Sequence, residues 1–215
     1  MSYSVKEIFY SLQGEGARSG RPAVFCRFSG CNLWSGEEKH RATAECQFCD
    51  TDFVGSDGDG GGKFKTASAL ATELSEFWPG SSNGVPYVVF TGGEPLLQLD
   101  SVLIDALHTA EFEIAVETNG TLKAPQGIDW LCVSPKGQTV LQQKSGNELK
   151  LVYPQQNVVP GRFESLDFDH FYLQPMAPLD GGAESARATA QCTDYCLTHP
   201  QWHLSLQTHK TLGIR

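Results

Sequence analysis

Three cysteines close together in the sequence are the residues best placed to do chemistry. Cys31 and Cys46 are separated by fourteen residues, and Cys46 and Cys49 by two, all in one loop-rich stretch. Three thiolates can hold a cubane of four irons and leave one iron with an open position, where a bound molecule can receive an electron. The spacing therefore predicts a reactive iron–sulfur centre in a cluster-binding loop over about residues 29–50.

A structural zinc site is the alternative that the spacing leaves open. Cys46 and Cys49 have the spacing of a chelating pair, and Cys31 together with Cys26 or His40 would complete a tetrahedron. Against zinc, Cys26 falls inside an expected strand, where a buried apolar role is the simpler expectation. The remaining cysteines are predicted to be core or surface thiols: Cys132, Cys192 and Cys196.

A glycine-rich segment, residues 91–95, directly follows the apolar run 87–90. A continuous apolar run of this length is typical of a parallel strand that is covered on both faces. Ligands of α/β proteins bind at the carboxyl ends of such strands, and glycines there let backbone amides approach a ligand closely. An ordinary strand-to-helix turn would have the same composition, but together with the three cysteines the segment predicts a ligand-binding strand end.

The elements that must position these residues alternate along the chain. The alternation implies right-handed crossovers and a parallel sheet. About six strand–helix units are visible, fewer than the eight of a full barrel, so we expect one α/β domain over residues 1–215. Its predicted fold is a partial TIM-like barrel, in preference to a doubly wound sheet. After an opening stretch at 5–10, we expect strands at 22–28, 87–90, 113–117, 130–133, 148–152, 171–173 and 202–206, and helices at 66–78, 100–110 and about 183–197.

Composition narrows the class of partner. The 215 residues carry a formal charge of −9 with a pI near 5.1, which disfavours nucleic acid as a partner and favours a small-molecule substrate. No stretch approaches the roughly 20 apolar residues that a membrane span requires. The start of the sequence has no basic and apolar run suited to secretion, and the seven cysteines are an odd number. We therefore expect a cytoplasmic protein with reduced thiols.

The cysteine loop and the glycine-rich strand end together resemble the radical S-adenosylmethionine superfamily. Its usual cysteine spacing is three then two, so the fourteen-residue gap departs from that pattern. Longer blocks are similar to the 7-carboxy-7-deazaguanine synthase family, some members of which carry the longer spacing. These blocks are residues 9–16, 26–33, 46–51, 117–120, 134–136 and 206–210.

The resemblance implies an enzyme that converts 6-carboxy-5,6,7,8-tetrahydropterin to 7-carboxy-7-deazaguanine with loss of ammonia, in queuosine and 7-deazapurine biosynthesis. It implies a [4Fe–4S] cluster, S-adenosylmethionine and Mg²⁺ as cofactors. It also implies an electron-donating redox protein as partner, and a homodimer.

The same resemblance assigns site residues. Cys31, Cys46 and Cys49 would hold the cluster and Thr51 the magnesium ion, although a threonine there could equally cap a turn. The adenosylmethionine would lie against Phe48, Asp50, Gly93, Ser134, Pro135, Lys136 and Gln174. The substrate would lie against Leu12, Gln13, Gly14, Glu15, Arg27, Thr91 and Glu117.

The chemistry of the pterin supports two of these assignments. The planar guanidinium of Arg27 suits a carboxylate, and the guanidine-like edge of a pterin needs acceptors such as Glu15 or Glu117. His203 and His209 are possible further contacts, although a surface or core role is the simpler expectation for each. A surface role also stays open for Lys136.

Two alternatives to this function remain open at this point. An activating enzyme of the same superfamily would make a glycyl radical on a partner protein, but it would need a groove for a protein loop. A zinc-stabilised binding module without catalysis would use the same cysteines.

Overall fold

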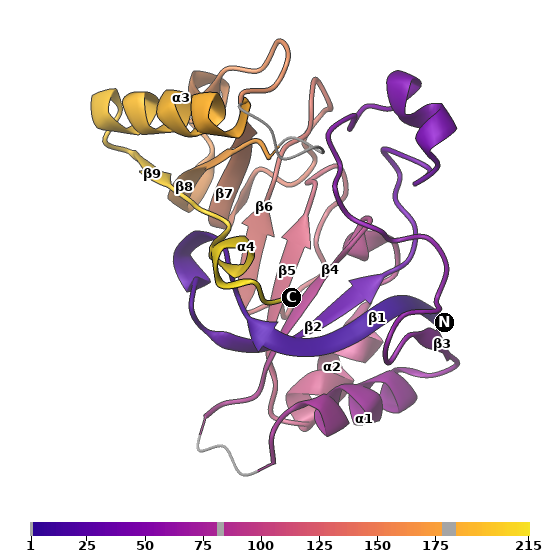
Figure 1. Ribbon diagram of the computed structural model, residues 1–215. Helices are drawn as coiled ribbons and strands as arrows, with labels where there is room; N and C mark the ends of the chain where they lie inside the picture. Colours follow the sequence, from indigo (N-terminus) through magenta and orange to yellow (C-terminus); the bar gives the residue numbers. More distant parts are fainter. Residues whose placement is uncertain (1, 81–83, 178–183) are drawn as a thin grey trace.

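The computed structural model describes residues 2–80, 84–177 and 184–215. In this part of the chain nine strands form one sheet, with helices against it (Figure 1). The strands are β1 (Tyr3–Leu12), β2 (Pro22–Phe28), β3 (Gly62–Phe64), β4 (Tyr87–Gly92), β5 (Glu113–Thr118), β6 (Trp130–Val133), β7 (Ser145–Tyr153), β8 (Asp167–Pro175) and β9 (Trp202–Leu204). The helices are α1 (Ala67–Phe77), α2 (Ser101–Thr109), α3 (Glu184–Thr198) and α4 (Thr208–Leu212).

The strand order confirms the predicted fold class. The sheet runs β3-β1-β2-β4-β5-β6-β7-β8-β9, and all pairs from β2 to β9 are parallel. Parallel strands in sequence order are the arrangement of an incomplete α/β barrel, because each crossover adds the next strand on the same side. The sheet stays open, with β3 and β9 at its edges.

One face of the sheet packs on α1 and α2, at the bottom of Figure 1. Val88 and Phe90 of β4 point to this side and join Leu70 and Leu103 in the hydrophobic core. The residues between them on the strand point to the opposite face, because side chains alternate along a strand. That opposite face is therefore available for a site.

Besides shifted limits of several strands, three features differ from the predicted elements. Strand β3 and helix α4 were not expected, because three and five residues are too few to show a period. Strand β1 is antiparallel to both of its neighbours. No α-helix lies in the described connections between β5 and β8, so the alternation of strands and helices is incomplete there. The predicted start of the last long helix, Ala183, lies outside the described residues.

Within residues 2–80, 84–177 and 184–215, none of the helices has the length and apolarity needed to cross a membrane.

The caps of α1 and α2 allow a matched test of what anchors this layer. Thr66 accepts a hydrogen bond from the Ala69 amide, and Asp100 accepts one from the Leu103 amide and another, at 2.7 Å, from the buried Tyr3 hydroxyl. We predict that Thr66→Ala lowers the free energy of unfolding by about 0.5–2 kcal/mol. Asp100→Ala should lower the free energy of unfolding by about 1–3 kcal/mol more than Thr66→Ala does, because it leaves the Tyr3 hydroxyl without its hydrogen-bond acceptor. Urea unfolding of both variants measures this, and equal costs would contradict it.

Candidate active site

A cavity of about 440 Å³ lies on the face of the sheet opposite α1 and α2, at the carboxyl ends of the strands. Residues of β1, β2, β4, β5, β7 and β8 line it, together with the cysteine loop and the segment around α4. The cavity is thus built by segments from both ends of the chain and its middle.

The structure brings nearly all the predicted site residues to this one cavity. It is lined by Leu12, Gln13, Gly14, Glu15, Arg27, Cys31, Cys46, Phe48, Cys49, Asp50, Thr51, Thr91, Gly93, Glu117, Ser134, Lys136 and Gln174. Pro135 is the exception: it is buried outside the cavity lining, and its carbonyl accepts a hydrogen bond from the Gln155 side chain. A role for Pro135 in direct contact with a ligand is therefore not supported by the geometry.

All three cysteines line the cavity. A hydrogen bond from Cys46 lowers the pKa of the Cys49 thiol, which makes Cys49 the readier thiolate of the pair. Among the described residues, no three Cys, His, Asp or Glu side chains lie close enough together to surround a single metal ion. Three soft sulfur donors in one cavity suit a cluster of several irons, in which each thiolate bonds a different iron.

The zinc alternative needed a fourth ligand from Cys26 or His40. Cys26 is fully buried in the hydrophobic core, as its strand position predicted. His40 lies on the surface and bonds the Ser35 hydroxyl at 2.9 Å. Neither residue lines the cavity with the three thiols, so a four-ligand zinc site is not formed by these residues.

Arg41 organises the long gap between the first and second cysteines. Its guanidinium donates at 2.9 Å to the carbonyls of Gln47 and Cys49 and lies 4.2 Å from the Trp34 ring centroid. The inserted residues therefore hold the turn that carries the second and third cysteines. Sequence reasoning missed Arg41, although an arginine and a tryptophan inside a cysteine loop were the available signal.

The glycine-rich strand end packs on the cysteine loop. A Cβ at Gly93 would stand 1.9 Å from the Gly30 carbonyl oxygen and 2.9 Å from the Cys31 Cβ, so a side chain there would displace the loop. Gly92 has a φ of 123°, and a Cβ there would stand 2.3 Å from the Phe28 carbonyl oxygen. From the sequence we predicted that these glycines let a ligand approach the backbone closely. The structure shows that they also let the cysteine loop pack against the strand end. The glycines keep Cys31 beside the end of β4.

The register of the sheet brings charged residues from distant strands together. Arg27 on β2 pairs with Thr91 on β4, Glu117 on β5 pairs with Cys132 on β6, and Cys132 pairs with Glu148 on β7. All five side chains point to the cavity face, because aligned positions of parallel strands face the same side. Cys132 is therefore a buried thiol, and its strand position next to Glu117 also makes it a neighbour of the site.

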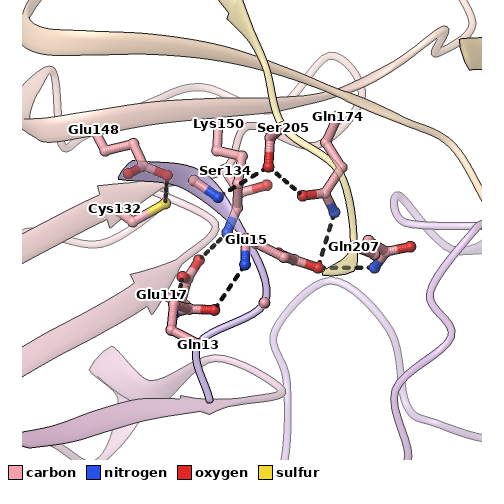
Figure 2. Close-up of polar contacts among 12 residues, drawn as sticks. Gln13, Glu15, Glu117, Cys132, Ser134, Glu148, Lys150, Gln174, Ser205 and Gln207 are labelled. Atoms are coloured by element: carbon pink, nitrogen blue, oxygen red, sulfur yellow. Dashed lines mark hydrogen bonds and ion pairs between the residues drawn. The ribbon is translucent and has the colours of Figure 1, made fainter. Parts of the chain in front are cut away.

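Lys150 is the centre of the polar network (Figure 2). Its ammonium lies 2.8 Å from a carboxylate oxygen of Glu15 and 2.8 Å from one of Glu117. Burial disfavours ionisation of Glu15, but the Lys150 charge outweighs it and lowers the pKa of Glu15 to about 2. Burial alone would lower the pKa of Lys150. Its anionic neighbours outweigh burial, so the pKa of Lys150 is raised above its ordinary value. Lys150 stands between two buried leucines of β7, and this break in the apolar pattern could have identified it.

Arg27 is held by a carboxylate on the neighbouring strand. Its Nε donates to Glu7 at 2.8 Å, and in the described part of the chain its two terminal nitrogens make no hydrogen bond. Because Arg27 lines the cavity, these nitrogens remain available for a bound anion. The sequence predicted Arg27 as a substrate contact but did not identify Glu7, whose carboxylate orients the Arg27 side chain.

The segment around α4 closes one side of the cavity. Thr208 donates its backbone amide to the Gly14 carbonyl at 2.9 Å, and Lys210 forms an ion pair of 2.9 Å with Asp50. His209 lines the cavity and lies where a side chain at position 14 would be, so only glycine fits there. Burial lowers the pKa of His209. His203, the other histidine considered, is exposed and absent from the described cavity lining.

Comparison with known proteins agrees with this site. No model of a protein family matches the chain. A 7-carboxy-7-deazaguanine synthase of Bradyrhizobium diazoefficiens is 61% identical over 215 residues, and one of Bordetella pertussis is 60% identical over 214 residues, each over 100% of both chains. The chain belongs to the 7-carboxy-7-deazaguanine synthase family.

More distant members of the family agree along the whole chain. The synthase of Haemophilus influenzae is 30% identical over 228 residues, 99% of this chain and 94% of its own. The crystal structure of QueE from Escherichia coli superposes with a TM-score of 0.71 at 26% identity, over 96% of this chain and 94% of that one. Family membership confirms the predicted resemblance. It describes the chain better than the glycyl-radical activating enzyme or the zinc-stabilised binding module does.

The low pKa of Glu15 predicts an acid-dependent loss of stability. Its folded pKa of about 2 lies below its ordinary value of 4.5, so its ionic stabilisation is complete above about pH 5 and is lost as the pH falls towards 2. We predict that the difference in free energy of unfolding between the wild type and Glu15→Gln shrinks over this interval, as measured by urea unfolding. Glu76→Gln, exposed on α1, is the control and should show no such change. A difference that stays constant down to about pH 2 would contradict the prediction.

Proposed function

We propose that this chain converts 6-carboxy-5,6,7,8-tetrahydropterin to 7-carboxy-7-deazaguanine with loss of ammonia, in the biosynthesis of queuosine and other 7-deazapurines. Family membership over the whole chain supports this proposal. The observation that carries it is the shared lining of one cavity by three thiols, a cationic side chain and two carboxylates. A pterin carboxylate, its guanidine-like edge and a redox centre could meet in such a cavity.

In this proposal Cys31, Cys46 and Cys49 hold a [4Fe–4S] cluster. S-adenosylmethionine binds beside it, along Phe48, Asp50, Gly93, Ser134, Lys136 and Gln174. When bound, the cluster and adenosylmethionine supply the radical chemistry, while the protein positions the reacting atoms and excludes side reactions. Arg41 keeps the loop of the second and third cysteines in place, and Gly93 keeps Cys31 close to the strand end.

The substrate binds between Arg27 and the two carboxylates. The free nitrogens of Arg27 receive the pterin carboxylate, and Glu15 and Glu117 accept hydrogen bonds from the donor-rich edge. Leu12, Gln13, Gly14 and Thr91 complete the surroundings. His209 closes the site from the side of α4.

A magnesium ion, a redox partner and a second subunit belong to the same proposal. Thr51 lines the cavity, and its hydroxyl would give Mg²⁺ one oxygen ligand, with substrate oxygens and water completing the shell. The reducing electron would come from a redox protein, and the chain would work as a homodimer, as the resemblance implies.

Reconstituted activity tests the proposed function. We predict that anaerobically purified protein is brown, bleaches with dithionite and contains iron and sulfide. With adenosylmethionine, Mg²⁺ and the carboxytetrahydropterin it should release 7-carboxy-7-deazaguanine and ammonia, measured by chromatography and mass spectrometry. Cys31→Ala should abolish both colour and product, whereas Cys196→Ala, on α3 and outside the described cavity lining, should keep both.

Two outcomes would count against this assignment. Colourless protein with stoichiometric zinc would refute the iron–sulfur site. Formation of 5′-deoxyadenosine without the deazaguanine product would favour the activating-enzyme alternative.

Substitution of Arg27 tests the placement of the substrate carboxylate. We predict that Arg27→Ala raises KM for the pterin by about 10- to 100-fold, because a charge-assisted hydrogen bond is lost. The visible absorbance of the cluster should be unchanged. Arg187→Ala, exposed on α3, is the matched control and should have wild-type KM. Loss of the cluster in Arg27→Ala would show that Arg27 has been misplaced.

A further inference from the structure

Lys150 is a buried cation with no part in the function proposed above. Its side chain is only 3% exposed, and it lies in the middle of β7. Among the described residues, no other lysine or arginine forms an ion pair with Glu15 or with Glu117. One ammonium therefore neutralises part of the charge of both.

The contacts around Lys150 fix the two carboxylates as a pair. Each carboxylate gives one oxygen to Lys150 and the other to side-chain amides (Figure 2). Gln207 and Gln174 donate to Glu15 at 2.8 and 3.1 Å, and Gln13 donates to Glu117 at 3.3 Å. Glu15 comes from the loop after β1 and Glu117 from the end of β5, so Lys150 joins two segments that are distant in the sequence.

The charges of this network favour a particular kind of ligand. One ammonium paired with two carboxylates leaves these three side chains with one net negative charge. Without the cation, two carboxylates this close would repel, and one of them would take up a proton and lose acceptor strength. Two ionised carboxylates suit a heterocycle whose edge presents several N–H donors.

The position of Arg27 orients such a heterocycle. Arg27 and Glu117 lie in one register row, with β4 between their strands. Two strand spacings are about 10 Å. This separation is comparable to the length of a bicyclic ring, so a ring with a carboxylate at one end and amino donors at the other would place its amino end at the pair of carboxylates.

We propose that Lys150 is a positioning residue that holds Glu15 and Glu117 as a pair of ionised acceptors, and that this pair selects a substrate with an exocyclic amino group beside a ring N–H. The proposal rests on the proposed function, because it takes a pterin as the substrate. Lys150 itself touches the carboxylates and acts on the substrate through them.

Selectivity between two ligands separates this role from a structural one. The probes are 6-carboxypterin and 6-carboxylumazine, which differ in that a carbonyl of the lumazine replaces the 2-amino group. Binding to the cluster-loaded protein is measured by ligand fluorescence. The wild type should bind the pterin more tightly, and Lys150→Met should reduce this preference about 10-fold or more.

Kinetics provide a second measurement on the same variant. Lys150→Met should raise KM for the carboxytetrahydropterin by about 10- to 100-fold and change kcat less, with affinity for adenosylmethionine unchanged. Lys144→Met, an exposed lysine just before the same strand, is the matched control and should keep both the preference and KM.

An unchanged preference in Lys150→Met would overturn the proposal, since a structural role would weaken both ligands equally. If Lys150→Met does not fold, Lys150→Gln, which removes the charge but keeps a polar group, decides by the same ratio. Failure of the wild type to form product would refute the proposed function. Product formation by the wild type with unchanged selectivity in the variant would refute only the role of Lys150.

Discussion

The parallel register of the sheet is the constraint on which the site depends. Because strands β2 to β9 run the same way, their carboxyl ends lie along one edge, and every second residue faces the cavity. Arg27, Thr91 and Glu117 are thereby placed on neighbouring strands although long stretches of sequence separate them. A shift of one residue in any strand would turn its site residue into the core under α1 and α2.

Burial of charge on this face is possible because each charge has a partner. Lys150 is balanced by two carboxylates, and Arg27 by Glu7. Glu94 is completely buried after the glycine pair, yet it accepts hydrogen bonds from the amides of Leu96 and Asn119 and from the Thr118 hydroxyl. This carboxylate connects the ends of β4 and β5, so it stabilises the strand end against which the cysteine loop packs.

Residues with a local signal were predictable from the sequence, and residues defined by long-range pairing were not. The strands 22–28 and 130–133 have the predicted limits, because their apolar runs are bounded by clear breaks. The cysteine triad and the glycine-rich strand end were visible as motifs. Lys150 and Glu7 were missed because their importance comes from partners on other strands. The break in the apolar pattern of β7 marks Lys150 as unusual, but no spacing within one segment reveals its partners. The position of α4 beside Gly14 likewise depends on contacts between residues that are far apart in the sequence.

The segment around α4 couples the two halves of the site. Lys210 pairs with Asp50, the residue after the third cysteine, and Gln207 donates to Glu15, one of the two carboxylates on Lys150. A single short segment thus contacts both the cysteine loop and the carboxylate pair. Since each contact is polar and only partly buried, neither alone fixes the segment strongly. Together with the bonds of Thr208 to Gly14, they hold the cysteine end of the cavity at a fixed distance from its carboxylate end. The proposed radical reaction between two bound molecules would require such a fixed distance.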